Sequence, residues 1–306
     1  MTTLVFGHKT PDTDATCSAL IWAWFLNEVR NDPAEAVLLD PCNTEAAFVL
    51  AHWGFAMPRV IADVDAGQKV VVVDTNSVAE LPPAINSADV TEVIDHHMLQ
   101  GGLSTKSPIM FTIRPLASTA TVMHGLMGDD AAKMPDAIKG LMLSCILSDT
   151  LALRSPTTTD TDRDLAVELA TSLDLSMADY AAEMFAAKSD ISDTTDGELI
   201  RFDSKIFDVD DAKLRVSVFE TTSPTTVLER KDSIMAAIPA IATDDGVDQV
   251  LFFLIDILNE GATLFIPNEA VRAIAQKSFG QEVDSDLLDL PGVVSRKKQI
   301  IPALKV

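Results

Sequence analysis

Three short apolar runs, each followed at once by histidine or aspartate, limit the fold of this chain more than any other feature. They read LVFGHKTPD, VVVVDTNS and VTEVIDHH and begin at Leu4, Val70 and Val90. Amphipathic stretches, Ala15–Val29 and Thr44–Trp53, follow the first run. Because strand-like and helix-like segments alternate, the sequence predicts an α/β fold with a doubly wound, mainly parallel sheet.

The polar end of each run indicates where a site would form. In doubly wound sheets, ligands bind beyond the carboxyl ends of the strands. All three runs end in residue types that ligate metals, so three separate segments would deliver such side chains to one edge of the sheet.

The chain is long enough for two domains, with 306 residues of which 47% are hydrophobic. From Ala117 to Ala187 the pattern is helical, and it then lapses into small acidic residues. We therefore expect a first domain over residues 1–188, a linker over 189–195 and a smaller mixed α/β domain over 196–306. In the helical part, the expected N-caps are Ser118, Asp160 and Ser176.

The balance of charge excludes several partners. Aspartate and glutamate number 46 against 23 lysines and arginines, which gives a formal net charge of -23. Such a chain repels nucleic acid and acidic membrane surfaces, so neither is an expected partner. A phosphate-bearing ligand would have to be held by metal ions or by a few local cations.

Cysteine usage and the N-terminal residues favour a soluble, cytoplasmic protein. Cys17, Cys42 and Cys145 lie in apolar contexts and form no closely spaced pair, so neither disulfides nor a cysteine zinc site is predicted. The N-terminus has no signal-peptide pattern, and no stretch reaches the ~18 apolar residues of a membrane span.

Several carboxylates are candidate metal ligands. His8, Asp12 and Asp14 put one imidazole and two carboxylates within seven residues, a compact set for a divalent first-row metal; an ordinary helix cap is the alternative. Asp74 and Asp149 each close a strongly apolar run, where a carboxylate is costly unless a cation meets it. For Asp74 the alternative is a cap on a helix that begins near Ser77.

The doubled histidine of IDHH suggests two functions. Neighbouring side chains on a strand diverge, so His96 and His97 could serve adjacent sites, one as a neutral metal ligand and one facing an anionic substrate. His52 and His124 are interpreted as core residues.

A basic cluster stands out near the C-terminus of this acidic chain. Arg296, Lys297 and Lys298 are consecutive and are flanked by apolar residues. A solvated tail is the common explanation for such a run, but here the apolar flanks favour an anchored phosphate clamp.

Taken together, the segments GHKTPDTD, VVVVDTN, IDHH, LSDT and SRKKQIIP resemble the signatures of the DHH phosphoesterase superfamily, and specifically of the manganese-dependent (family II) inorganic pyrophosphatases. The resemblance runs from His8 to Pro302. It implies a catalytic, metal-binding DHH domain, a DHHA2-type C-terminal domain that closes over pyrophosphate, and a homodimer formed through the N-terminal domain. Thr10 departs from the pattern, because the family usually has Asn there.

The resemblance also assigns residues. It implies that His8, Asp12 and Asp74 hold one metal and that Asp14, Asp74, His96 and Asp149 hold the other, so that Asp74 bridges both. The residues implied to contact the substrate are His97, Lys205, Arg296 and Lys297. The implied cofactors are two Mn2+ per subunit, with Co2+ or Mg2+ able to serve, and Mg2+ that accompanies the substrate.

The expected reaction is hydrolysis of inorganic pyrophosphate to two orthophosphates by a metal-bridging hydroxide. A short-chain exopolyphosphatase of the same superfamily is one alternative, and a metal-binding module without catalysis is another. A DHH nuclease is less consistent with the sequence, because the only paired glycines, Gly101 and Gly102, lack the context of a glycine-rich nuclease motif.

Overall fold

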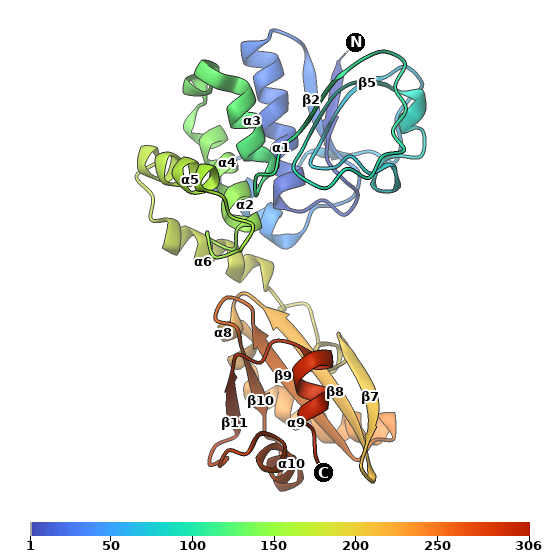
Figure 1. The fold of residues 1–306 in the computed structure, drawn as a ribbon, viewed down its shortest axis with the longest axis vertical. Helices are drawn as coiled ribbons and strands as arrows, with labels where there is room; N and C mark the ends of the chain where they lie inside the picture. The colour runs from blue at the N-terminus through green and yellow to red at the C-terminus, as the bar shows by residue number, and fades with distance from the viewer. Residues whose placement is uncertain (1) are drawn as a thin grey trace. The chain divides into compact units, whose positions relative to one another are not determined.

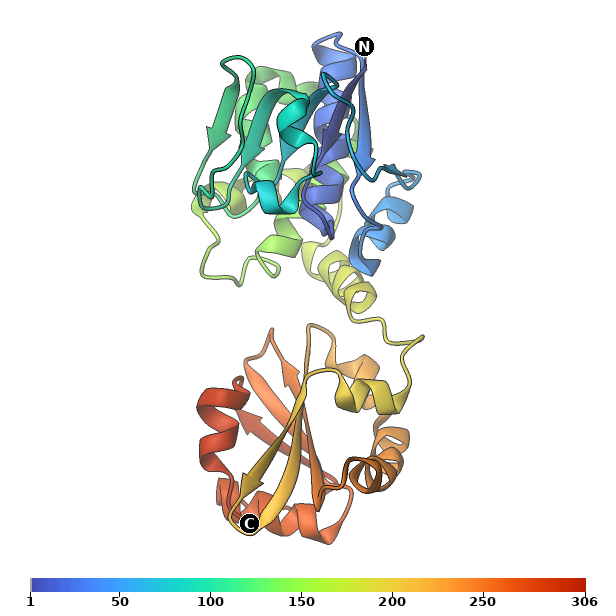
Figure 2. The same cartoon turned by 90° about the vertical axis from the view of Figure 1, so that its right-hand side faces the viewer.

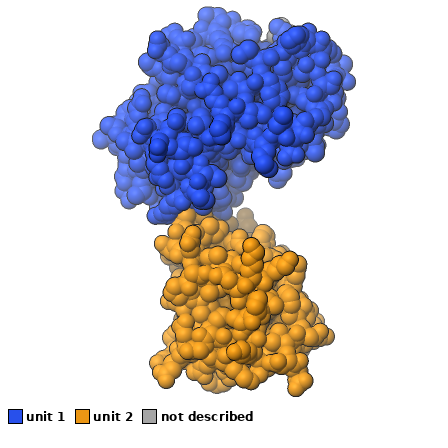
Figure 3. Space-filling model, in the orientation of Figure 1, with its two compact units in different colours: residues 1–188 blue, residues 189–306 orange. Residues whose placement is uncertain are grey.

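The structure, a computed structural model, describes residues 2–306. The chain divides into two compact units, residues 1–188 and residues 189–306, which Figure 3 colours separately. The boundary falls directly after helix α6 (Met177–Lys188). Each unit has its own sheet and its own core.

The sheet of the first unit has six strands in the order β3-β2-β1-β4-β5-β6, and every pairing in it is parallel. This confirms the predicted fold class. The three apolar runs form β1, β4 and β5, which are neighbours in the sheet, and the strand order reverses between β1 and β4. The strands are β1 (Thr3–Phe6), β2 (Ala34–Leu38), β3 (Arg59–Val60), β4 (Lys69–Val73), β5 (Asp89–Asp95) and β6 (Met110–Ile113).

Both faces of this sheet are covered. The four valines of β4, Val70–Val73, are all buried, which requires packing on each side of the strand. The long helices lie on one face, and short 3-10 segments, Val78–Glu80 and Ile85–Ser87, lie over the other (Figures 1 and 2). Val70 and Val72 share a core with Leu81 and Ile85 on the second face.

The helices of the first unit match the predicted helical stretches. They are α1 (Thr13–Trp24), α2 (Thr44–His52), α3 (Thr119–Met127), α4 (Asp136–Asp149), α5 (Asp160–Ser172) and α6. A π-helical turn at Phe25–Val29 continues α1.

Two of the three expected N-caps are correct, and one is misplaced. The Ser118 hydroxyl accepts a hydrogen bond from the Ala120 amide at the start of α3, and the Ser176 hydroxyl accepts one from the Asp179 amide at the start of α6. The cap of α5 is Thr159 and not Asp160, because Thr159 and Asp162 form a reciprocal capping box. Both residue types are good caps, so composition alone did not distinguish the two positions.

The second unit is a smaller mixed α/β structure with strand order β11-β10-β9-β8-β7, in which only the β8–β9 pairing is parallel. Successive residues of β9 point into two different cores, for example Phe252 and Phe253. The strands are β7 (Ser204–Val209), β8 (Ala212–Thr221), β9 (Gln249–Asp256), β10 (Gly261–Phe265) and β11 (Leu287–Pro291). The helices are α7 (Asp196–Arg201), α8 (Pro224–Leu228), α9 (Lys231–Asp245), α10 (Glu269–Phe279) and α11 (Ile301–Ala303), preceded by a π-helical turn at Arg296–Ile300.

Within residues 2–306, no helix combines the length and the apolar character that crossing a lipid bilayer requires.

Candidate metal centre

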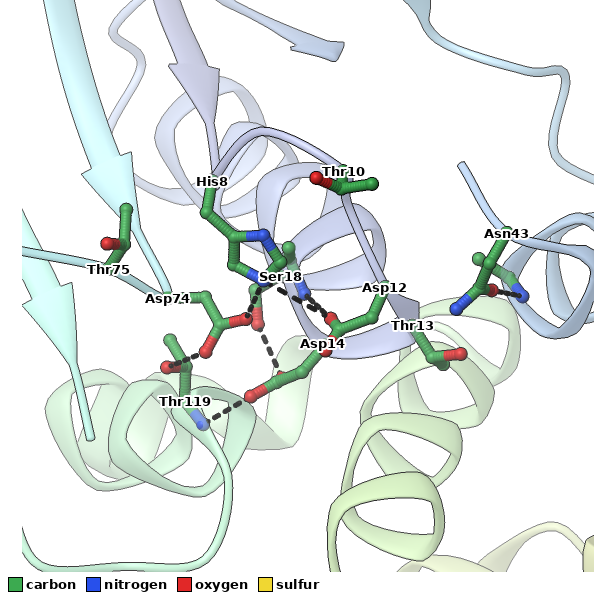
Figure 4. A network of polar contacts seen from close by, with 12 residues as sticks. His8, Thr10, Asp12, Thr13, Asp14, Ser18, Asn43, Asp74, Thr75 and Thr119 are labelled. Carbon is green, nitrogen blue, oxygen red and sulfur yellow. Dashed lines mark hydrogen bonds and ion pairs between the residues drawn. The ribbon is translucent and has the colours of Figure 1, made fainter. Parts of the chain in front are cut away.

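The carboxyl ends of three adjacent strands and the ends of two helices meet at one point of the first unit. β1, β4 and β5 lead directly into His8, Asp74 and His96. Figure 4 shows part of this arrangement, with His8, Asp12, Asp14 and Asp74 directed toward one another. The structure brings together all six of the residues implied as ligands, namely His8, Asp12, Asp14, Asp74, His96 and Asp149.

Asp74 lies at the centre of the cluster, with 1% of its side chain exposed. Its Oδ2 is 3.5 Å from His8 Nε2, and its Oδ1 is 3.4 Å from His96 Nε2. The Thr119 hydroxyl donates to Oδ1 at 2.9 Å, which orients the carboxylate. The alternative interpretation as a helix cap is wrong, because Ser77 occupies the N-cap position of the Val78–Glu80 segment. The two oxygens of Asp74 therefore face two different ligand groups.

His8, Asp12 and Asp74 form the first group. The His8 Nδ1–H group donates to the Lys9 carbonyl at 2.7 Å, so Nε2 faces the carboxylates, 3.7 Å from Asp12 Oδ1. Asp12 is also the N-cap of α1, since its Oδ1 accepts from the Ala15 amide. The Asp12 side chain can therefore cap α1 and also belong to a group that could hold a metal.

Asp14, His96 and Asp149 form the second group, beside Asp74. His96 Nε2 lies 3.9 Å from Asp14 Oδ2 and 3.9 Å from Asp149 Oδ2, while its Nδ1–H group donates to the Leu116 carbonyl. Oδ2 of Asp149 is buried and accepts no hydrogen bond from residues 2–306. A buried carboxylate oxygen of this kind calls for a cation.

Neutral donors hold Asp14 in place. Its Oδ1 accepts from the Ser18 and Ser118 hydroxyls at 3.0 and 3.2 Å, and its Oδ2 accepts from the Thr119 amide at 2.7 Å. The last of these donors is in the first turn of α3, where the helix dipole also favours negative charge.

The histidines of the cluster bind protons strongly. Burial opposes the charged form of His8, but its contacts with Asp12 and Asp74 outweigh burial and raise its pKa to about 11. Burial likewise opposes the charged form of His96, and Asp74 and Asp14 raise its pKa to about 9. The site therefore attracts positive charge into a buried position.

The surroundings of each carboxylate decide whether its pKa is raised or lowered. Burial, reinforced by Asp74, raises the pKa of Asp14 to about 6, and burial with the neighbouring Asp14 raises the pKa of Asp149 well above its ordinary value. Burial also opposes ionisation of Asp74, but His8 and His96 hold its pKa below the ordinary value. One imidazole with carboxylates in each group is a ligand set that suits a divalent first-row metal, so the residues fit the implied Mn2+.

The expectation that His96 and His97 diverge is wrong. β5 ends at Asp95, so strand alternation no longer applies, and the two imidazole rings lie 4.3 Å apart. Asp95 Oδ1 accepts from both histidine amides and from His97 Nδ1 at 2.9 Å, which stabilises a bend at His97. Both rings face Asp74, because His97 Nδ1 lies 3.8 Å from its Oδ1, and Asp74, His96 and His97 form a third group that could hold a metal. The two histidines differ in exposure, with 15% of the His96 side chain and 52% of the His97 side chain accessible.

Asn76 orders the segment that carries His97, and sequence reasoning missed it. Its Nδ2 donates to Asp95 and to the Met98 carbonyl, and its Oδ1 accepts from the Gln100 amide at 2.6 Å. A cavity of about 370 Å3 is lined by His8, Thr75, Asn76, Ser77, Glu80, His97, Met98 and Gln100. The position of Asn76, just beyond the end of β4, was the available sequence signal.

The remaining predicted residues lie in the second unit. Arg296 donates through Nη2 to Asp203 Oδ1 and through Nη1 to the Asp203 carbonyl, both at 2.8 Å. Lys205 follows two residues later in β7. Lys205 and Lys297 are exposed, and neither forms an ion pair with another described residue.

The basic segment is an anchored turn. Gln299 accepts hydrogen bonds from the Val294 and Ser295 amides and donates to the Gly292 carbonyl at 2.6 Å. Ile300 and Leu304 belong to the core of the second unit. Asp203 and Gln299 were not identified from the sequence, because each acts through a contact and not through a motif.

His52 is not a core residue, since it is exposed beside Trp53 and Tyr180, and His124 is half-buried. Thr10 has a φ of 55°, a left-handed conformation that Asn adopts more readily than a β-branched residue.

The sequence matches the DHH family, N-terminal domain, over residues 2–148 and the DHHA2 domain over residues 182–306. Proteins named probable manganese-dependent inorganic pyrophosphatases are similar to it: one from Deinococcus radiodurans is 37% identical and one from Lactobacillus johnsonii is 34% identical, each over 98% of this chain and 97% of the relative. A crystal structure from Methanococcus jannaschii, assigned to the family II inorganic pyrophosphatases, has 31% identity and a TM-score of 0.61 over 98% of this chain and 97% of that one.

Mn2+ binding should tighten as the pH rises. The pKa values of about 6 for Asp14 and about 9 for His96 mean that metal binding must displace protons, so higher pH removes the competitor. Calorimetric titration of the full chain with Mn2+ between about pH 6 and pH 9, in buffers of different ionisation enthalpy, measures both affinity and proton release. Binding that is independent of pH and releases no protons would contradict this assignment.

Proposed function

The chain belongs to the DHH family with a DHHA2 domain, as a member of the manganese-dependent inorganic pyrophosphatases, and from this premise we propose that it hydrolyses inorganic pyrophosphate to two orthophosphates. The observation that carries the proposal is Asp74, a buried carboxylate whose two oxygens face two separate groups of N and O ligands. Such an arrangement suits two metal ions that share one carboxylate.

His8, Asp12 and Asp74 would hold one Mn2+. Asp14, Asp74, His96 and Asp149 would hold the second. Co2+ or Mg2+ could replace Mn2+ in the same oxygen and imidazole set, and Mg2+ would accompany the substrate. When bound, two divalent ions supply the positive charge that activates a water molecule and holds the attacked phosphoryl group.

His97 would act on the substrate and not on the metals. Its Nδ1–H group donates to Asp95, which leaves Nε2 as the atom free to meet a phosphate oxygen. The contact with Asp95 outweighs burial and raises the pKa of His97, so the ring keeps its proton more readily. A protonated Nε2 can donate a hydrogen bond or a proton to the leaving phosphate.

The second unit would supply a basic clamp made of Lys205, Arg296 and Lys297. Asp203 holds the guanidinium of Arg296 in a fixed orientation, and ordering a cation in advance lowers the cost of binding a phosphate. Residues 1–188 would be the catalytic domain, 189–195 the linker and 196–306 the domain that closes over pyrophosphate. Closure would exclude water from the reacting phosphates.

We further propose that the protein is a cytoplasmic homodimer. Strand β6 is an edge strand whose Met110 and Phe111 are 63% and 42% exposed, and a second copy could pair with this open edge. The three cysteines are free, which suits a reducing compartment.

The reaction is tested by phosphate release from pyrophosphate with Mn2+ present. We expect turnover by the unaltered chain and a loss of more than about 100-fold in Asp74→Asn, because the shared ligand is weakened for both ions. Asp136→Asn, which changes an exposed carboxylate outside the cluster, is the matched control. A faster rate with tripolyphosphate would favour the exopolyphosphatase, and no phosphate release from either substrate would favour a non-catalytic module.

Substitutions of His96 and His97 should distinguish a metal ligand from a residue that acts on the substrate. His96→Gln should weaken Mn2+ binding, because the ring lies among Asp14, Asp74 and Asp149. His97→Gln should retain Mn2+ affinity and lose about 100-fold or more in kcat or kcat/KM, as a general acid would. Calorimetry with Mn2+ and steady-state kinetics on both variants decide between them. Equal losses of Mn2+ affinity in the two variants would contradict these separate roles of His96 and His97.

Arg296→Gln should lower kcat/KM about 100- to 1,000-fold and leave Mn2+ affinity unchanged, because the guanidinium would act only on phosphate oxygens. Lys298→Gln, which changes an exposed cation two residues along and outside the proposed clamp, is the matched control and should change little. A truncation that removes Leu290 to Val306 is a poorer test, because it also removes Leu290, Ile300 and Leu304 from the core. Wild-type kinetics in Arg296→Gln would overturn the clamp.

A further inference from the structure

Glu45 is a fully buried carboxylate that the proposed reaction does not use. It lies in the first turn of α2, where Asn43 is the N-cap. Its Oε2 accepts hydrogen bonds from the Thr13 hydroxyl at 2.8 Å and the Ser148 hydroxyl at 2.7 Å, and it is 3.2 Å from Lys188 Nζ. One oxygen atom thus joins three separate helices of the first unit.

The two hydroxyls that Glu45 binds belong to neighbours of the implied metal ligands. Thr13 stands between Asp12 and Asp14 at the start of α1, and Ser148 directly precedes Asp149 at the end of α4. Both hydroxyl-bearing residues are buried. The Glu45 carboxylate therefore fixes the spacing between the segments that contribute ligands to both groups.

Burying this charge is unfavourable unless it is compensated. Lys188 supplies a cation, and the first turn of α2 favours an anion through the helix dipole. Even so, Glu45 Oε1 is buried without a hydrogen-bond partner among the described residues. An apolar residue of similar size could fill the space, but it could not orient two hydroxyls at once.

We propose that Glu45 is a positioning residue of the metal centre, which holds the start of α1 and the end of α4 in register, with Lys188 as its required counter-charge. The inference rests on the proposed function only for the identity of the ligands. Lys188 is the last residue of the first unit, so metal affinity would depend on how the end of α6 is held.

The experiment measures Mn2+ affinity of the full chain by calorimetry, without pyrophosphate. Glu45→Gln should bind Mn2+ about 10- to 100-fold more weakly, as observed when supports of metal ligands are removed, and saturating Mn2+ should restore most of its turnover. The matched control is Glu92→Gln. Glu92 is also buried and accepts from a cation, Arg30, and from Trp22, but it contacts neither a ligand nor a ligand's neighbour. The Glu92→Gln variant should keep wild-type Mn2+ affinity.

Lys188→Met separates positioning from simple electrostatics. Removing a cation near the site would by itself favour Mn2+, so a purely electrostatic influence predicts tighter binding in this variant. Positioning predicts weaker binding, because a carboxylate without its counter-charge would be drawn toward water and release both hydroxyls. The double variant Glu45→Gln/Lys188→Met should then bind no more weakly than Glu45→Gln alone.

Thr13→Val removes one hydroxyl without changing charge and should also weaken Mn2+ binding, so the test survives if Glu45→Gln fails to fold. Wild-type Mn2+ affinity in folded Glu45→Gln or Thr13→Val, or tighter binding in Lys188→Met, would overturn the positioning role. Because these measurements need no pyrophosphate, they stand apart from the assay of hydrolysis. An inactive wild-type chain would sink the proposed function alone.

Discussion

The structure depends on the burial of several negative charges at one end of a parallel sheet. Asp14, Asp74 and Asp149 are packed around His96, and Asp74 also faces His8. Like charges at this separation repel in a low-dielectric interior, so the arrangement persists only with compensating positive charge. Protons on the histidines can provide that charge, and divalent ions would displace them and take their place.

The geometry around the cluster is set by neutral hydrogen bonds and not by the charges themselves. His8 and His96 each donate from Nδ1 to a backbone carbonyl, so both present Nε2 to the carboxylates. The start of α3 orients Asp14 and Asp74 through an amide and a hydroxyl of Thr119. In the second unit an ion pair has the comparable role, since Asp203 fixes the direction of Arg296. Ordering the groups in advance removes much of the entropy cost of binding.

The errors of the sequence interpretation have a common origin. Strand alternation does not extend to His96 and His97, because β5 ends at Asp95 and the chain bends there. The cap of α5 was misplaced by one residue, because Thr159 gains a reciprocal partner that Asp160 lacks. Asn76 and Glu45 were overlooked, since their importance comes from contacts with residues distant in the chain.

By itself, the sequence determined the fold class and the family, because hydrophobic periodicity selects strands and helices, and it identified candidate ligands, because ligand chemistry restricts residue type. His8, Asp74 and His96 could be anticipated together, since parallel strands place their carboxyl ends at one edge. Tertiary structure alone decided that β1, β4 and β5 are neighbours, that the two oxygens of Asp74 face different groups, and that Glu45 ties α1 to α4. These features depend on distances between segments far apart in the chain, and local sequence carries no information on such distances.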